Sequence, residues 1–143
     1  LVTTTFALIV IGTLVTGSGQ HSGDSAGVPR MGFVWAQVTV VHGVLGTLVL
    51  VLALALFGSL RTRPETSLAR RRVVIFLIVT VAQAALGLLQ ANIGVPAGLV
   101  AIHVLGSALV WVGVLRVLLD VNPRLFRTVG LQAPVEAAVS IHR

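Results

Sequence analysis

Four apolar stretches joined by short polar links make up most of this 143-residue chain. They cover residues 1–16, 34–60, 73–93 and 99–119. The last three reach the roughly 20 residues with which an α-helix crosses the hydrocarbon of a bilayer, and the first is shorter. This pattern predicts an all-α fold, a transmembrane four-helix bundle over residues 1–121 built from two helical hairpins. The first stretch lacks a methionine, a charged segment and a cleavage pattern, so we expect part of a longer protein and no signal peptide.

The composition supports a membrane protein and removes several other classes. Hydrophobic residues make up 56% of the chain and charged residues 10%, whereas about a quarter of a soluble domain is charged. The net charge of +6 comes from ten basic residues, all arginines at the ends of apolar stretches or in the tail. They indicate topology, and no nucleic-acid partner is expected. The chain has no cysteine, which excludes disulfides, zinc thiolate sites and covalent c-type haem.

The arginines predict the orientation in the membrane. The 17–33 loop contains only Arg30 and the 94–98 link contains none, whereas the link between the second and third stretches carries Arg61, Arg63, Arg70, Arg71 and Arg72. By the positive-inside rule this arginine-rich link is cytoplasmic. The arginines after the fourth stretch place residues 122–143 on the same side, as a cytoplasmic tail. Both termini of this segment are therefore expected in the cytoplasm of a multi-pass cell-membrane protein.

Two histidines lie inside membrane-grade apolar runs. His42 and His103 each follow the start of a run by a few residues, and an ionisable side chain there is costly and needs a reason. Both runs cross the bilayer in the same direction, which puts the imidazoles at similar depth towards the outer face. Such a pair on facing helices suits the two axial positions of one haem iron. The small neighbours Gly43, Gly46, Gly106 and Ala108 would leave room for the flat macrocycle.

The simpler interpretation is that each histidine bridges helices through a hydrogen bond to a carbonyl, Gln83, Gln90 or Asn92. Amides within the membrane, including Gln37, mark the bundle interior and are expected to act chiefly as helix-bridging groups. Two further residues lie near the outer mouth. His21, in the loop, could cap the site or have no special role, and Arg30 could meet a haem propionate or anchor the interface. Trp35 is expected at the membrane interface and Trp111 in packing.

A short repeat links the two histidines. Residues 41–47 and 102–107 share an aliphatic residue, His, Val-Leu-Gly and a hydroxyl residue, with one extra glycine in the first copy. Each copy opens the second helix of a hairpin, so the bundle resembles two copies of one hairpin about a pseudo-two-fold axis. No Asp or Glu lies in the middle of a span. A carboxylate general base or proton relay is therefore not expected inside this bundle, and we assign no catalytic residue.

Several segments together resemble the C-terminal half of a bacterial haem A synthase, most closely the actinobacterial type. The segments are Gly12–Asp24 (GTLVTGSGQHSGD), His42, Gln83 to Pro96, and Leu99 to His103 with Gly106. The resemblance extends over about residues 5 to 120. It implies an eight-helix membrane protein made of two four-helix bundles, of which this chain is the second half.

The resemblance also implies a function. The family oxidises a methyl group of haem O to the formyl group of haem A, for assembly of cytochrome oxidase. The N-terminal bundle would hold haem O, with a glutamate three residues before its first histidine. This chain has Thr39 at that position, which matches the other half, where His42 and His103 would be the axial ligands of haem B. The expected partners are the N-terminal half, haem O, the lipid bilayer and haem O synthase, and the fragment alone is expected to be inactive.

Two other functions remain open. The four helices could form a stand-alone cytochrome b-like redox protein that pairs as a homodimer with bis-histidine haem. The chain could instead be a non-redox membrane scaffold or a small transporter subunit, in which the histidines only bridge helices. The native mass in detergent distinguishes the homodimer from half of a longer protein. Failure to retain haem would favour the non-redox scaffold or transporter subunit.

Overall fold

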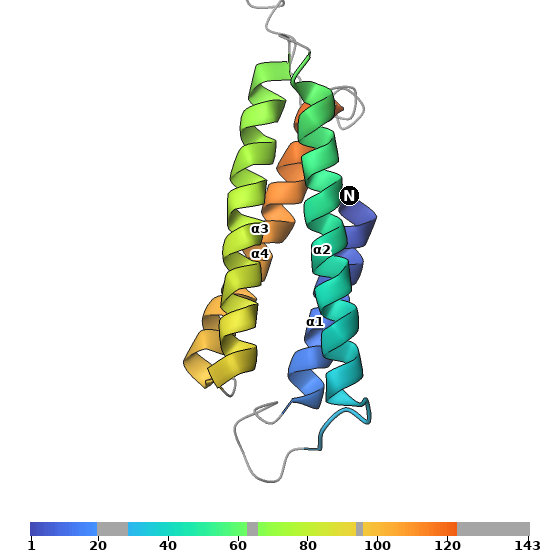
Figure 1. The fold of residues 1–143 in the computed structure, drawn as a ribbon, viewed down its shortest axis with the longest axis vertical. Coiled ribbons are helices and arrows are strands. Elements are labelled where there is room, and N and C mark those ends of the chain that lie inside the picture. The colour runs from blue at the N-terminus through green and yellow to red at the C-terminus, as the bar shows by residue number, and fades with distance from the viewer. Residues whose placement is uncertain (20–28, 63–65, 94–95, 123–143) are drawn as a thin grey trace, which may run out of the picture.

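The computed structural model describes residues 1–19, 29–62, 66–93 and 96–122, and these residues form four helices and no strand. The helices are α1 (Val2–Ser18), α2 (Trp35–Leu60), α3 (Ser67–Ile93) and α4 (Ala97–Val121). They stand side by side as a bundle (Figure 1). The predicted all-α four-helix fold is confirmed. The 122–143 tail lies outside the described residues, apart from Asn122.

Each helix packs against its neighbours in chain order around the bundle. The most extensive contacts join α3 to α4 and α1 to α2, which are the two predicted hairpins, and smaller contacts join α2 to α3 and α1 to α4. This order puts α2 and α4 on opposite corners of the bundle. Side chains from these two helices can therefore meet only across its interior, which is what the proposed histidine pair requires.

The helix limits follow the apolar stretches except at the start of α3. That helix begins at Ser67, six residues before the apolar stretch that starts at Val73. The extra residues include Arg70, Arg71 and Arg72. Hydropathy detects only the part of a helix that lies in hydrocarbon, and arginine is a good helix former that extends the helix into the polar region.

Three of the helices can cross a membrane. α2, α3 and α4 have 25 to 27 residues and strongly apolar 18-residue windows, whereas α1, with 17 residues, is a shorter apolar helix. The surfaces of the long helices are lined with exposed aliphatic side chains; examples are Val40, Ile78, Leu88 and Leu105. Such surfaces suit lipid, and these helices identify the chain as a membrane protein.

The packed apolar core occupies one half of the bundle. It consists of Val49, Ala53, Leu60, Ala69, Val73, Phe76, Val110, Val114 and Val117. All of these lie between the middle of the bundle and its arginine-rich end. Phe76, 1% exposed, is the largest of them, and its ring fits against the bare backbone of Gly113. This half holds the bundle together, and the histidines lie in the other half.

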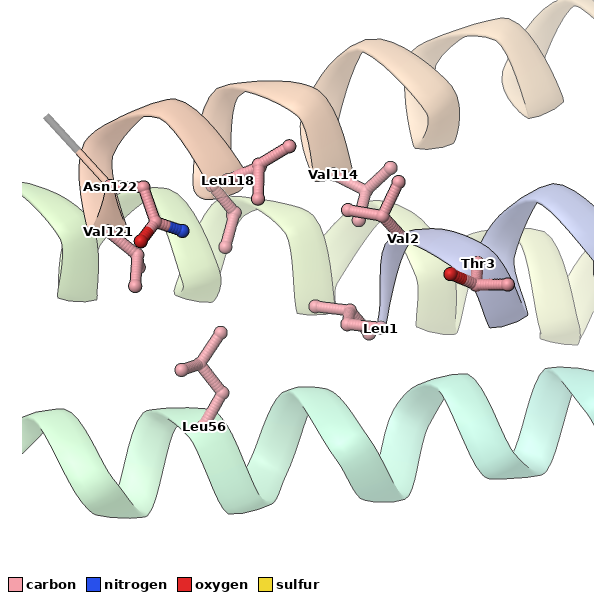
Figure 2. A pocket seen from close by; sticks show the side chains of 9 residues that line it. Leu1, Val2, Thr3, Leu56, Val114, Leu118, Val121 and Asn122 are labelled. Carbon is pink, nitrogen blue, oxygen red and sulfur yellow. The ribbon is translucent and has the colours of Figure 1, made fainter. Parts of the chain in front are cut away.

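A cavity of about 300 Å³ also lies at the arginine-rich end, between the first residues of α1, α2 and the last turns of α4. Figure 2 shows Leu56 approaching it from α2 and Val114 and Leu118 from α4. Its lining is aliphatic apart from Thr3 and Asn122 and includes no titratable side chain. We therefore assign it no chemistry.

Candidate functional site

His42 and His103 face each other across the bundle interior. Their ring centres lie 6.4 Å apart and their planes are inclined by 66°. His42 follows the first residue of α2 by seven residues, and His103 follows the first residue of α4 by six. Both imidazoles are only partly buried. The structure therefore brings together the two residues that the sequence singled out, at matched depth on diagonal helices.

The ring of His42 lies against α1. A Cβ atom placed on Gly12 would be only 3.0 Å from His42 Cε1, so a side chain at this position would force the imidazole to shift by a few tenths of an ångström. The Nδ1 atom of His42 lies 3.1 Å from the main-chain oxygen of Leu8, one turn earlier on α1. A carbonyl oxygen can only accept, so Nδ1 carries the proton in this bond. The Nε2 atom then keeps its lone pair for a ligand.

The ring of His103 lies against α3 in a similar way. A Cβ atom on Gly87 would be 3.5 Å from His103 Cε1, an ordinary van der Waals contact. The Nδ1 atom of His103 is buried and has no hydrogen-bond partner among the described residues. One turn further along α4, the carboxamide of Gln83 occupies the space beside Gly106 where a Cβ would lie. The Oε1 atom of Gln83 is likewise buried without a partner in the described part of the chain.

The half of the bundle around the histidines is less completely buried than the other half. Among the described residues of this half, no apolar side chain is fully buried; the buried residues are Ser18, Gln90 and Gly106. Protein interiors are normally close-packed by side chains. The packed end and the end with the imidazoles therefore differ in how completely their side chains are buried.

The spacing of the rings fits two axial ligands of one metal ion. Metal–imidazole bonds are about 2 Å long and a ring nitrogen lies about 1.1 Å from the ring centre, so two axial imidazoles have centres about 6.3 Å apart. The observed separation is 6.4 Å. Rotation about each metal–nitrogen bond is free, so the inclination of 66° is compatible with this arrangement. Within the described ranges no group of three or more His, Cys, Asp or Glu side chains gathers, so a metal ion held by the two imidazoles would need further ligands from a bound group.

The other polar residues noted in the sequence are placed as follows. Gln83 lies against Gly106, one helical turn from His103. Gln90 is buried, whereas Gln37 and Arg30 are exposed. Asn92 donates to the Leu88 carbonyl on its own helix, so it does not bridge helices through this bond. His21 and Asp24 lie outside the described residues.

The two tryptophans and the small residues also have defined surroundings. Trp111 packs against Phe6, with ring centres 5.9 Å apart, as expected for a packing residue. Trp35 lies near the end of α1, beside Gly19, and is 37% exposed. A Cβ added to Gly43 would meet nothing within 4 Å, so this position leaves open space, whereas the space at Gly106 is filled by Gln83.

Gly12 and Gly87 were missed by reasoning from the sequence. They lie on α1 and α3, the helices that carry no histidine, and each receives one imidazole ring. One signal could have found Gly87, because it follows Gln83 by one helical turn and therefore lies on the same interior face. Gly12 opens the Gly12–Asp24 segment of the resemblance, but nothing in that segment indicates a contact with an imidazole.

Comparisons with known proteins neither support nor contradict the resemblance to haem A synthases. No family model matches the chain, and neither a curated protein nor a solved structure matches it.

Proposed function

We propose that this chain is the haem-holding part of a membrane oxidoreductase of the haem A synthase kind, with His42 and His103 as the axial ligands of one haem B. The observation that carries the proposal is the pair of imidazoles 6.4 Å apart across the bundle interior. The Nδ1 hydrogen bond that leaves Nε2 of His42 free supports it. The sequence resemblance over about residues 5 to 120 supplies the family.

The protein's own contribution is to hold and orient the ligands. The Leu8 carbonyl fixes the tautomer and the ring plane of His42, and Gly12 and Gly87 let the two rings approach the backbone of α1 and α3. With His42 and His103 both bound to its iron, the haem would have no open site for a substrate and would supply single-electron transfer. In this proposal the haem O methyl group is oxidised on the N-terminal half. The described bundle either passes electrons or has a structural role.

The proposed setting follows from the same interpretation. The N-terminal four-helix half, the substrate haem O and the surrounding lipid are the proposed partners, with haem O synthase as the protein that supplies the substrate. The arginine-rich ends of α2 and α3 are proposed to face the cytoplasm, which puts the histidine pair towards the outer face of the cell membrane.

A second function has one observation in its favour. The bond from His42 Nδ1 to the Leu8 carbonyl already bridges α2 to α1, and a non-redox scaffold would need no more from this residue. The scaffold gives no role to the unpartnered Nδ1 of His103 or to the match of the ring spacing to axial ligation. We therefore place it second.

Extraction of the cofactor tests the proposal. The full chain, purified in detergent after expression with haem available, is expected to carry one haem B per chain, identified by the spectrum of its pyridine complex. The complete synthase containing this half is expected to convert haem O to haem A, followed by chromatography of the extracted haems. A chain that is folded by circular dichroism but free of haem would overturn the proposal and favour the scaffold.

A further inference from the structure

Two buried polar atoms near the site lack partners. They are Nδ1 of His103 and Oε1 of Gln83, and neither makes a hydrogen bond with any described residue. The imidazole Nδ1 can carry a proton and donate, whereas the carboxamide oxygen can only accept. Buried polar groups in native proteins are nearly always paired, so a donor and an acceptor left open on two packed helices call for a common explanation.

The two side chains lie one helical turn apart along the same α3–α4 contact. Gly87, one turn after Gln83, lies against the ring of His103, and Gly106, about one turn after His103, lies against the carboxamide of Gln83. One turn of helix spans about 5.4 Å. The glutamine side chain has three rotatable bonds, so its oxygen can reach the imidazole when the ring is held in place by a ligand.

The other hairpin shows what such a bond does. His42 lies against Gly12, and its Nδ1 atom is bonded to the residue four positions earlier on α1, Leu8. His103 lies against Gly87, and the residue four positions earlier on α3 is Gln83. The two hairpins therefore place Leu8 and Gln83 at corresponding positions. Leu8 offers only its main-chain oxygen, whereas Gln83 adds a side-chain acceptor.

We propose that Gln83 is the positioning residue for His103, with Gln83 Oε1 accepting a hydrogen bond from the Nδ1–H of His103 when the site holds its haem. This inference rests on the proposed function. The bond would fix the tautomer that directs Nε2 to the metal, as outer partners of metal-bound histidines commonly do. It would also increase electron donation by His103 and so favour the oxidised metal, which lowers the reduction potential.

The test measures the reduction potential of the full chain in detergent by a spectroscopic redox titration. Gln83→Leu removes the acceptor, and its potential is expected to become more positive than that of the wild type, with haem content retained. Gln83→Glu keeps an acceptor oxygen, and its potential is expected to stay at or below the wild-type value. Gln37→Leu, the same change at an exposed position of α2, is the matched control and is expected to leave the potential unchanged.

The outcomes separate the two proposals. If wild type binds haem through both histidines but Gln83→Leu keeps the wild-type potential, the role of Gln83 is wrong and the main-chain carbonyls suffice. An equal rise in Gln83→Leu and Gln83→Glu would also overturn it, because the acceptor oxygen would then be irrelevant. A wild type without haem would overturn the proposed function itself. If Gln83→Leu does not fold, Gln83→Met replaces it as an unbranched apolar variant with the same expected shift.

Discussion

Arg72 and Asp120 form an ion pair that ties the beginning of α3 to the end of α4, with Arg72 Nε 3.3 Å from Asp120 Oδ2. Asp120 lies in the last turn of α4, where the helix dipole disfavours a negative charge. The guanidinium of Arg72 offsets this, and both side chains are partly shielded from solvent, with 36% and 20% exposed. The pair fastens the α3–α4 hairpin at the end opposite the histidines.

Breaking this pair is expected to weaken the hairpin modestly. A double-mutant cycle with Arg72→Gln and Asp120→Asn should give a coupling of about 0.5–1 kcal/mol in the free energy of unfolding, measured in mixed detergent. Arg71→Gln is the control, because Arg71 is the exposed neighbour. A coupling of zero would show that the two charges act independently.

The core residue Phe76 is expected to matter more than any ion pair. Phe76→Ala removes a ring that is 1% exposed and leaves a cavity beside Gly113. In water such a change costs about 3–5 kcal/mol, but lipid is as apolar as the core, so only the packing part is lost. We expect destabilisation of about 1–3 kcal/mol by the same unfolding measurement.

The matched control for Phe76 is Ile78→Ala on the same helix, where the side chain is 64% exposed. It is expected to change the free energy of unfolding by much less. Equal effects of the two substitutions would mean that Phe76 does not pack in the core as described.

Gly12 is expected to be needed for the position of His42. In Gly12→Ala the new methyl group would lie 3.0 Å from His42 Cε1, so the ring must move by a few tenths of an ångström. We expect loss of haem or a partly high-spin visible spectrum. Gly43→Ala, next to His42 but with nothing within 4 Å of the added carbon, should keep the wild-type spectrum. Identical spectra for the two variants would contradict this account of the ring's position.

The proposed orientation can be checked by labelling. The chain has no cysteine, so a single one can be introduced at exposed Gly32 or exposed Arg71 without a background signal from the chain. A membrane-impermeant maleimide added to intact cells should label Gly32→Cys and leave Arg71→Cys unlabelled until the cells are opened. The reverse pattern would place the arginine-rich end outside.

The sequence predicted the four helices and the histidine pair, because both depend on the length and spacing of apolar runs. It could not predict which way each helix is turned about its axis. In a membrane the lipid-facing side is as apolar as the interior side, so the helical period carries little information on the buried face. The positions of Gly12, Gly87 and Arg72 relative to their partners depend on that rotation, and only the packed structure reveals them.

The spacing of 6.4 Å between the imidazole rings was also beyond the sequence. Matched depth along α2 and α4 indicates that two side chains can meet, but the separation of diagonal helices depends on the core around Phe76 and Val114. The same applies to Gln83, whose amide marked an interior position without indicating its contact with Gly106.

The central claim is that His42 and His103 hold one haem between them. The most direct test is the oxidised and dithionite-reduced visible spectrum of the purified full chain, compared with His42→Ala, His103→Ala and the tail variant His142→Ala as control. We predict a low-spin b-type spectrum for wild type and His142→Ala, and loss of haem or conversion to high spin in each of the other two. A colourless wild type, or an unchanged low-spin spectrum in either axial variant, would contradict the account.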